Sequence, residues 1–236
     1  MTKTERVMVA QDTMPGKTNH LDRPAAVANS LTSQAYGRLE EMIVTLRLEP
    51  GQILSEAFLV GELHIGRTPV REALQRLAFE GLVVILPRRG VLVSEIDLSQ
   101  QLTLLEVRRE IERLIARKAA SRADEAERQA FSTLADGLAR AAHDNDAAAF
   151  MQLDLRFNQM TLAAARNDYA TRTMRLMQGL SRRFWYRHYR ETFDLGRCAH
   201  LHRAVAETIA AGEPERAAAA SDALLDYIAE FSRATV

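Results

Sequence analysis

Two arginines four residues apart, Arg67 and Arg71, stand at the beginning of a predicted helix. Side chains at positions i and i+4 project from one face of a helix, and its N-terminal end carries the positive pole of the helix dipole. A guanidinium group there suits contact with a phosphate or a bidentate hydrogen bond to guanine. Thr68 is the predicted N-cap and Pro69 the first helical residue, where its missing N–H costs nothing. The chemistry indicated is recognition of nucleic acid.

A second basic group, Arg88 and Arg89 followed by Gly90, lies between two short apolar runs. Apolar and β-branched runs joined by a turn that contains glycine predict a β-hairpin with this basic group at its tip. The segment 67–90 holds five arginines and two acids, although the formal net charge of the chain is zero. A local positive excess favours DNA binding, whereas the alternative is a solvated helix face.

The elements that would position these arginines form a winged helix-turn-helix. Ser55 is the predicted cap of a helix that ends near Leu63, and the turn 64–66 leads into the helix with the two arginines. Strands are predicted at 82–85 and 91–93, with the basic hairpin tip between them.

Four motifs of this region resemble the GntR family of bacterial transcription regulators, in order and in spacing. They are Leu54-Ser55-Glu56, Arg67-Thr68-Pro69-Val70-Arg71-Glu72-Ala73-Leu74, Glu80-Gly81-Leu82 and Pro87-Arg88-Arg89-Gly90. The resemblance implies that the helix reads the major groove and that the wing reaches the adjacent backbone or minor groove. The residues implied in DNA contact are Arg67, Thr68, Arg71, Arg88, Arg89 and Gly90. Two positions depart from the family: His64 replaces a usual glycine, and Gly66 replaces a usual serine or threonine. His64 is therefore expected at positive φ.

A third set of polar residues interrupts apolar helical stripes farther along the chain. Arg108 lies in line with Leu104 and Ile111, and its guanidinium needs a partner if it is buried. That partner could be an acid on a neighbouring helix, or the carboxylate of a ligand bound bidentately. Two other apolar helix faces carry polar residues, Asp154 with Asn158 on one and His202 on the other. Each residue by itself suits a hydrogen bond in the core. Together with Arg108 they predict a polar pocket.

The predicted fold is mainly α: an N-terminal winged helix-turn-helix with a small β-hairpin wing, and a C-terminal antiparallel all-helical bundle. Residues 1–30 are predicted to be a mostly disordered arm, 31–94 the DNA-binding domain, and 98–234 the bundle. A helix over about 33–48, with Leu39, Ile43 and Leu46 facing inward, opens the first domain. The bundle helices are predicted at 98–122, 124–143, 146–165, 168–192, 196–211 and 213–233, with Asp124 and Asp146 as caps.

The bundle resembles the FCD domain, the ligand-binding domain of the FadR branch of the GntR family, in its shorter six-helix form. The motifs are Glu106-Val107-Arg108, Asp154-Leu155-Arg156-Phe157, His202-Arg203-Ala204-Val205 and Ala211-Gly212-Glu213. The resemblance implies a divalent metal held by an aspartate, a histidine four residues later, and two further histidines. The matching positions here are Asp154, Asn158, His202 and Leu224.

Two of those four positions are therefore weak or impossible ligands, because an amide oxygen binds zinc or nickel poorly and leucine does not bind at all. Asp222 and His188 are conceivable substitutes. We expect no required cofactor, with an incomplete zinc or nickel site at Asp154 and His202, assisted by Asn158, as the alternative. In the favoured case Arg108, Asn158 and His202 bind an effector directly.

The segment 182–190 is both basic and aromatic. Stacking and charge of this kind suit single-stranded nucleic acid, but the winged helix already supplies a DNA-binding surface. A helix presents these residues on all sides, so we assign Arg183 and Trp185 to the effector pocket.

The single cysteine, Cys198, excludes an internal disulfide and fits a reducing cytoplasm, and no apolar run suits a membrane span. The expected function is a cytoplasmic homodimeric repressor, not an enzyme, that binds a pseudo-palindromic operator and is released by a small carboxylate. The alternatives are a metal-dependent enzyme with an accessory winged helix, and an architectural DNA-binding protein without an effector.

Overall fold

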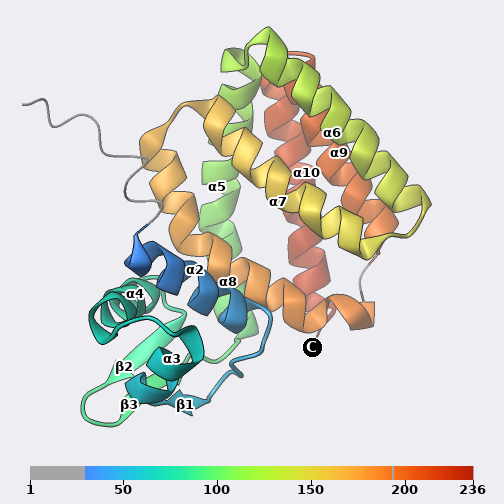
Figure 1. The fold of residues 1–236 in the computed structure, drawn as a ribbon. Coiled ribbons are helices and arrows are strands. Elements are labelled where there is room, and N and C mark those ends of the chain that lie inside the picture. The colour runs from blue at the N-terminus through green and yellow to red at the C-terminus, as the bar shows by residue number, and fades with distance from the viewer. Residues whose placement is uncertain (1–29, 193, 236) are drawn as a thin grey trace, which may run out of the picture.

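The computed structural model describes residues 30–192 and 194–235, so the predicted N-terminal arm lies outside the described residues except for Ser30. A small domain of helices and a short sheet sits at one end of a larger bundle of long helices (Figure 1). This arrangement confirms the predicted fold class.

The small domain is a winged helix. Its helices are α2 (Leu31–Val44), α3 (Glu56–Leu63) and α4 (Arg67–Phe79), and its strands are β1 (Ile53–Leu54), β2 (Val83–Leu86) and β3 (Gly90–Val93). The strands form an antiparallel sheet in the order β1-β3-β2. The predicted hairpin is β2 and β3; β1 was not predicted, because two residues carry no alternating pattern and become a strand only by pairing with β3.

Local sequence signals explain most of the boundaries in this domain. The Ser55 hydroxyl caps α3 by accepting a hydrogen bond from the Phe58 amide, as predicted, and His64 ends that helix at φ 54°. The predicted cap of α4 was wrong: Gly66 is the N-cap, and Thr68 lies inside the first turn. The predicted end of the first helix was also four residues too late, because the chain leaves α2 after Val44 and Leu46 adopts φ 59°.

The bundle contains the six predicted helices, each within about one residue of its predicted bounds. They are α5 (Leu98–Arg122), α6 (Glu125–His143), α7 (Ala147–Ala165), α8 (Asp168–Thr192), α9 (Leu195–Ala210) and α10 (Pro214–Arg233). Asp124 and Asp146 cap α6 and α7 as predicted. α5 packs along α10, α6 packs along α9, and α7 contacts α5, α6 and α9.

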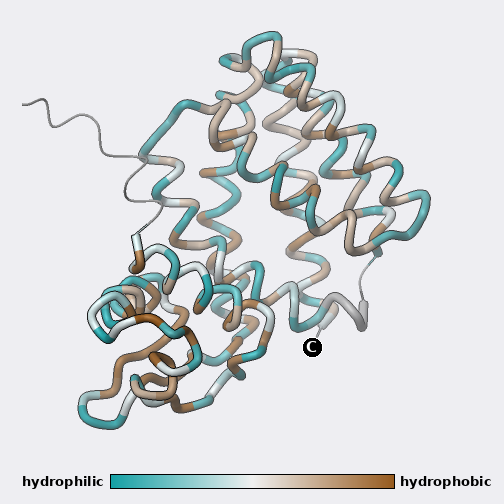
Figure 2. Tube along the Cα trace, viewed as in Figure 1, coloured by the Kyte–Doolittle hydropathy of each residue, from teal (hydrophilic) through white to brown (hydrophobic). Residues whose placement is uncertain are grey.

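Each part has its own apolar core. One buried cluster fills the bundle around Phe131, Leu134 and Ile209, and another fills the winged helix around Leu39, Leu59 and Leu77. Hydrophobic and hydrophilic positions alternate along the bundle helices (Figure 2), as expected when one face of each helix is buried. The exception to this separation is α8, whose Leu180 packs against the winged-helix core. No helix in the described part of the chain is long and apolar enough to cross a bilayer.

Candidate nucleic-acid interface and effector cavity

One face of α4 holds the helix on the domain and the opposite face lies in solvent. Val70, Ala73, Leu74 and Leu77 are buried, whereas Arg67, Thr68 and Arg71 are all exposed. The structure therefore leaves the predicted DNA-contacting residues of α4 accessible at the N-terminal end of the helix.

The arginines of this region differ in how they are held. The Arg71 Nε donates to a Glu56 carboxylate oxygen at 2.7 Å, in a pair whose side chains are 62% and 37% exposed; such a pair is weak and easily exchanged for a phosphate. Arg76 lies 3.5 Å from the centre of the Tyr36 ring and pairs with Glu80, so it belongs to the packing of the domain. Within the described residues, Arg67 and the two wing arginines form no ion pair.

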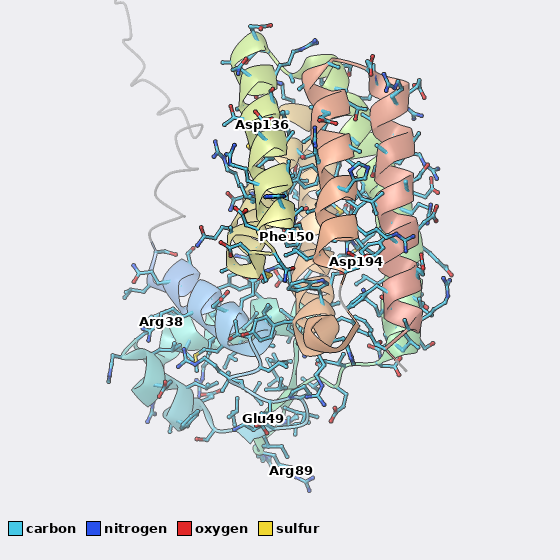
Figure 3. The ribbon with its side chains drawn as sticks, turned by 90° about the vertical axis from the view of Figure 1, so that its right-hand side faces the viewer. Arg38, Glu49, Arg89, Asp136, Phe150 and Asp194 are labelled. Atoms are coloured by element: carbon cyan, nitrogen blue, oxygen red, sulfur yellow. The ribbon has the colours of Figure 1, made fainter. Side chains whose placement is uncertain are left out.

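The wing tip is fixed by a glycine. Gly90 has φ 111°, and a Cβ atom built there would lie 2.3 Å from the Leu54 carbonyl oxygen. Only glycine lets β3 approach the chain before α3 so closely. Arg88, which adopts φ 64°, and Arg89 are exposed at this turn. Arg89 extends from the wing away from the bundle (Figure 3), where it can reach a neighbouring DNA backbone.

A cavity of about 790 Å³ lies between the bundle helices and reaches α2 of the winged helix. Five of the six predicted effector residues line it: Arg108, Asp154, Asn158, Trp185 and His202. Residues of α2 also line it, among them Glu40, Glu41 and Thr45. The size fits a small organic ligand, and residues of both domains contribute to the cavity wall.

Arg108 is held in the cavity wall by one ion pair and one neutral hydrogen bond. Its Nε donates to a Glu112 carboxylate oxygen at 2.6 Å, and its Nη1 donates to the Ser181 hydroxyl at 2.8 Å. The sequence suggested an acid on a neighbouring helix as the partner of Arg108. The partner acid instead lies one turn away on the same helix. The side chains of Arg108 and Glu112 are 12% and 15% exposed.

His202 is buried and both its ring nitrogens face acceptors. Nδ1 lies 2.9 Å from the Cys198 carbonyl oxygen, and Nε2 lies 3.0 Å from a carboxylate oxygen of Asp154. The Asn158 amide also donates to that carboxylate, at 3.1 Å. Burial by itself lowers the pKa of His202, but the Cys198 sulfur and Asp154 outweigh it, so the pKa lies well above its ordinary value. The edge-on Phe150 and Phe157 rings, about 5.4 and 5.3 Å away, complete the pocket.

This donor set does not fit the four-ligand metal site implied by the family. The His202 Nε2 lies 3.0 Å from a carboxylate oxygen of Asp154, so the chain keeps two of the four expected ligands side by side and supplies no histidine at the other two positions. The position expected for the fourth ligand is the buried, apolar Leu224. Asp222 is engaged by Arg113 at 2.9 Å and is absent from the cavity wall. Across the described residues no three His, Cys, Asp or Glu side chains are grouped to hold a metal ion.

The assignment of Arg183 to the effector pocket was wrong. Its guanidinium points to the domain junction, where it donates to the carbonyl oxygens of Ser94 and Glu95, both at 2.8 Å. Basic and aromatic residues occur on all sides of α8, so the sequence did not show which side of the helix faces the cavity. Cys198 was missed as a lining residue; its spacing of four from His202 on α9 was the available signal.

Comparison with known families decides the identity of both parts. Residues 31–93 match the bacterial regulatory proteins of the gntR family, and residues 103–227 match the FCD domain. The chain belongs to the GntR family. Its helical part is an FCD domain, in agreement with the resemblance stated from the motifs.

Individual relatives are similar over part of this GntR chain. It is 48% identical over 62 residues to an HTH-type regulator in an unstable DNA locus of Streptomyces ambofaciens, covering 26% of each chain. It is 38% identical over 91 residues to the Escherichia coli repressor RspR, covering 39% of this chain and 40% of RspR. The matches thus span less than half of either relative.

The fold of most of the chain is also found in solved structures. Escherichia coli McbR/YncC superposes with a TM-score of 0.74 at 19% identity, covering 87% of this chain and 98% of that protein. At that identity the likeness establishes the fold and nothing about ligand or operator.

Proposed function

We propose that this protein is a DNA-binding transcriptional repressor whose operator affinity is lowered by a small carboxylate bound in the FCD cavity. The observation that carries the proposal is the cavity itself, which is lined by Arg108 and His202 from the bundle and by Glu40 and Glu41 from the winged helix. A ligand that contacts both domains can favour one relative arrangement of them, and that differential affinity is what regulation requires.

Arg108 is the proposed anchor for the ligand carboxylate. The Ser181 hydroxyl that accepts its hydrogen bond is uncharged. A charged carboxylate is a stronger acceptor for a guanidinium. A ligand can therefore replace Ser181 while the Glu112 ion pair persists. Asn158, His202 and Trp185 would complete recognition without a metal.

Operator recognition is proposed to require a homodimer, because a two-fold pseudo-palindromic site needs two recognition helices. In each subunit Arg67, Thr68 and Arg71 would contact the major groove. Arg88 and Arg89, positioned by Gly90, would contact the adjacent backbone or minor groove. Such a protein would act in the cytoplasm and catalyse no reaction.

The test starts with selection of bound sequences from random DNA by the purified full chain. We expect enrichment of a pseudo-palindromic sequence, and no enrichment would favour an architectural protein. Titration with citrate, gluconate and benzoate should then identify a carboxylate that weakens binding by about 5–150-fold, the usual range of allosteric coupling. If none of these and no extended carboxylate panel changes the affinity, the effector proposal fails.

Metal dependence is tested on the same sample by elemental analysis and by melting with and without EDTA. We expect less than one zinc or nickel per chain and an unchanged Tm. One tightly bound metal per chain, with a fall of several degrees on chelation, would replace direct recognition by a metal-mediated site.

A further inference from the structure

One short segment of α8, residues 178–183, touches the cavity, the winged helix and the interdomain linker, which is residues 94–97 between β3 and α5. We call it the coupling segment. Gln178 and Ser181 line the cavity, and Ser181 accepts the hydrogen bond from Arg108. We propose that the coupling segment transmits occupation of the cavity to the recognition helix, with Arg183 as its positioning residue. This inference rests on the proposed function, because it names the route by which a ligand acts.

Arg183 holds the linker in an unusual way. Its side chain is buried, with 3% of its surface exposed, and its two hydrogen bonds go to the neutral carbonyl oxygens of Ser94 and Glu95. Its buried Nε has no hydrogen-bond partner among the described residues. Burial lowers the pKa of this guanidinium to about 10, with a smaller opposing effect of Glu95. A buried charge that is only partly compensated is costly, so this clamp is poised to rearrange.

The clamp is joined to the recognition helix by three successive hydrogen bonds. Arg183 donates to the carbonyl of Ser94, the Ser94 amide donates to the carbonyl of Leu82 at 3.1 Å, and the Leu82 amide donates to the carbonyl of Leu77 at 2.9 Å. Leu77 belongs to α4 and is buried in the winged-helix core. A movement of Arg183 therefore reaches the C-terminal end of the recognition helix through backbone groups alone.

Direct packing supports the same route. A Cβ atom built on Gly179 would lie 2.8 Å from the Leu82 side chain, and a Cβ atom built on Gly81 would lie 3.9 Å from the Leu180 side chain. The backbone of α8 thus lies against the corner that follows α4. In Figure 1, α8 runs beside α2 along the lower side of the bundle, where the two domains meet.

Arg182 contributes less to this junction. It pairs with Glu41 at 3.3 Å and with Glu40 at 3.9 Å on α2, and its own side chain is 37% exposed. Exposed pairs of this length are weak and are screened by salt. The coupling segment therefore acts mainly through Gly179, Leu180 and Arg183.

The sequence of events follows from these contacts. A carboxylate that takes the place of Ser181 at Arg108 removes the hydrogen bond that ties the coupling segment to α5. Ser181 is two residues before Arg183, so a shift of this turn displaces the guanidinium that holds the linker. Because packed elements adopt discrete arrangements, a small displacement changes the orientation of the winged helix.

Hydrogen exchange on the full chain, without DNA or ligand, tests this route. The readout is the exchange rate of the Ser94 and Leu82 amides, which form the path to α4. Arg183→Met should raise both rates about tenfold or more, since the linker loses two charge-assisted hydrogen bonds. Arg183→Lys should restore part of the protection, because a lysine retains a charged donor.

The decisive variant is Ser181→Ala, which alters only the cavity end of the segment. We expect it to raise exchange at the same two amides by about threefold or more, since local protection reports the free energy of opening. Gly179→Ala, which forces Leu82 away, should do the same. Arg187→Met, an exposed residue one turn beyond the segment, is the control and should leave the rates unchanged.

The outcomes separate transmission from a local structural role. If Arg183→Met raises exchange and Ser181→Ala does not, Arg183 only braces the linker and the proposed route is wrong. If neither variant affects Ser94 and Leu82, the clamp itself is wrong. Unchanged exchange in α6 shows that a variant is folded. Because neither DNA nor effector is present, these results stand apart from the selection and titration that test the proposed function.

Discussion

Replacement of Arg108 by methionine is the sharpest test of how the cavity is built. The change keeps an unbranched side chain, shorter than that of arginine, and removes the charge that faces Glu112 and Ser181. Removing one partner of a fully buried ion pair costs about 3–5 kcal/mol. Since the two side chains here remain 12% and 15% exposed, we expect a loss of about 2 kcal/mol, which is below that range.

That loss corresponds to a Tm about 4–8 °C lower for a chain of this size. The double variant Arg108→Met/Glu112→Met should recover most of the stability, because removal of both charges leaves no unpaired charge and only the neutral Ser181 hydroxyl loses its partner. Arg203→Met is the matched control: Arg203 pairs with Glu207 at the same i,i+4 spacing but with 40% and 50% exposure, and its loss should cost well under 1 kcal/mol. Urea denaturation measures all three changes.

The same variants separate stability from ligand recognition. The double variant should be folded and should still lack any response of operator affinity to the carboxylate that acts on the wild-type protein. A response equal to that of the wild type would refute Arg108 as the anchor. A control loss at Arg203 as large as that at Arg108 would refute the argument from burial.

Three further predictions concern the DNA surface and the domain junction. Arg71→Ala should weaken operator binding by about 1–3 kcal/mol in a gel-shift titration; equal affinities would contradict the docking of α4. Gly90→Ala should lower the free energy of unfolding by about 1–3 kcal/mol, since it places a Cβ at φ 111° and 2.3 Å from the Leu54 oxygen, and calorimetry measures it. Glu40→Gln should stabilise the protein at pH 7 but not at pH 3. Burial raises the pKa of Glu40, so the wild-type protein loses stability as the pH rises through that folded-state pKa. A glutamine has no charge to bury at either pH. Urea denaturation of both proteins at the two pH values measures the effect. An equal difference in the free energy of unfolding at pH 3 and pH 7 would contradict the prediction.

Local signals in the sequence were sufficient for the six bundle helices. Asp124 and Asp146 are followed by amphipathic runs long enough to specify α6 and α7, and the caps form as expected. The positive φ of His64 was expected because the family usually carries glycine at this position of the turn. Such features depend on the few residues on either side, so a pattern of residue types is enough to predict them.

Contacts between segments that are distant in the sequence could not be predicted from the pattern of residue types. β1 exists only because Ile53 and Leu54 pair with β3. Arg183 and Trp185 are two residues apart on α8, yet one reaches the linker and the other lines the cavity. Their types predict a buried or ligand-binding role for both, and only the packing of α8 against two domains separates them.

The chain by itself thus determined a winged helix-turn-helix joined to a six-helix FCD bundle, because capping, periodicity and motif spacing are local properties. The tertiary structure decided which arginines remain available. It bonds Arg108 to Ser181, stacks Arg76 on Tyr36 and places Arg183 at the junction. The physical reason is that the state of a charged side chain depends on the acceptors and the solvent that surround it, and both are set by segments far away in the sequence.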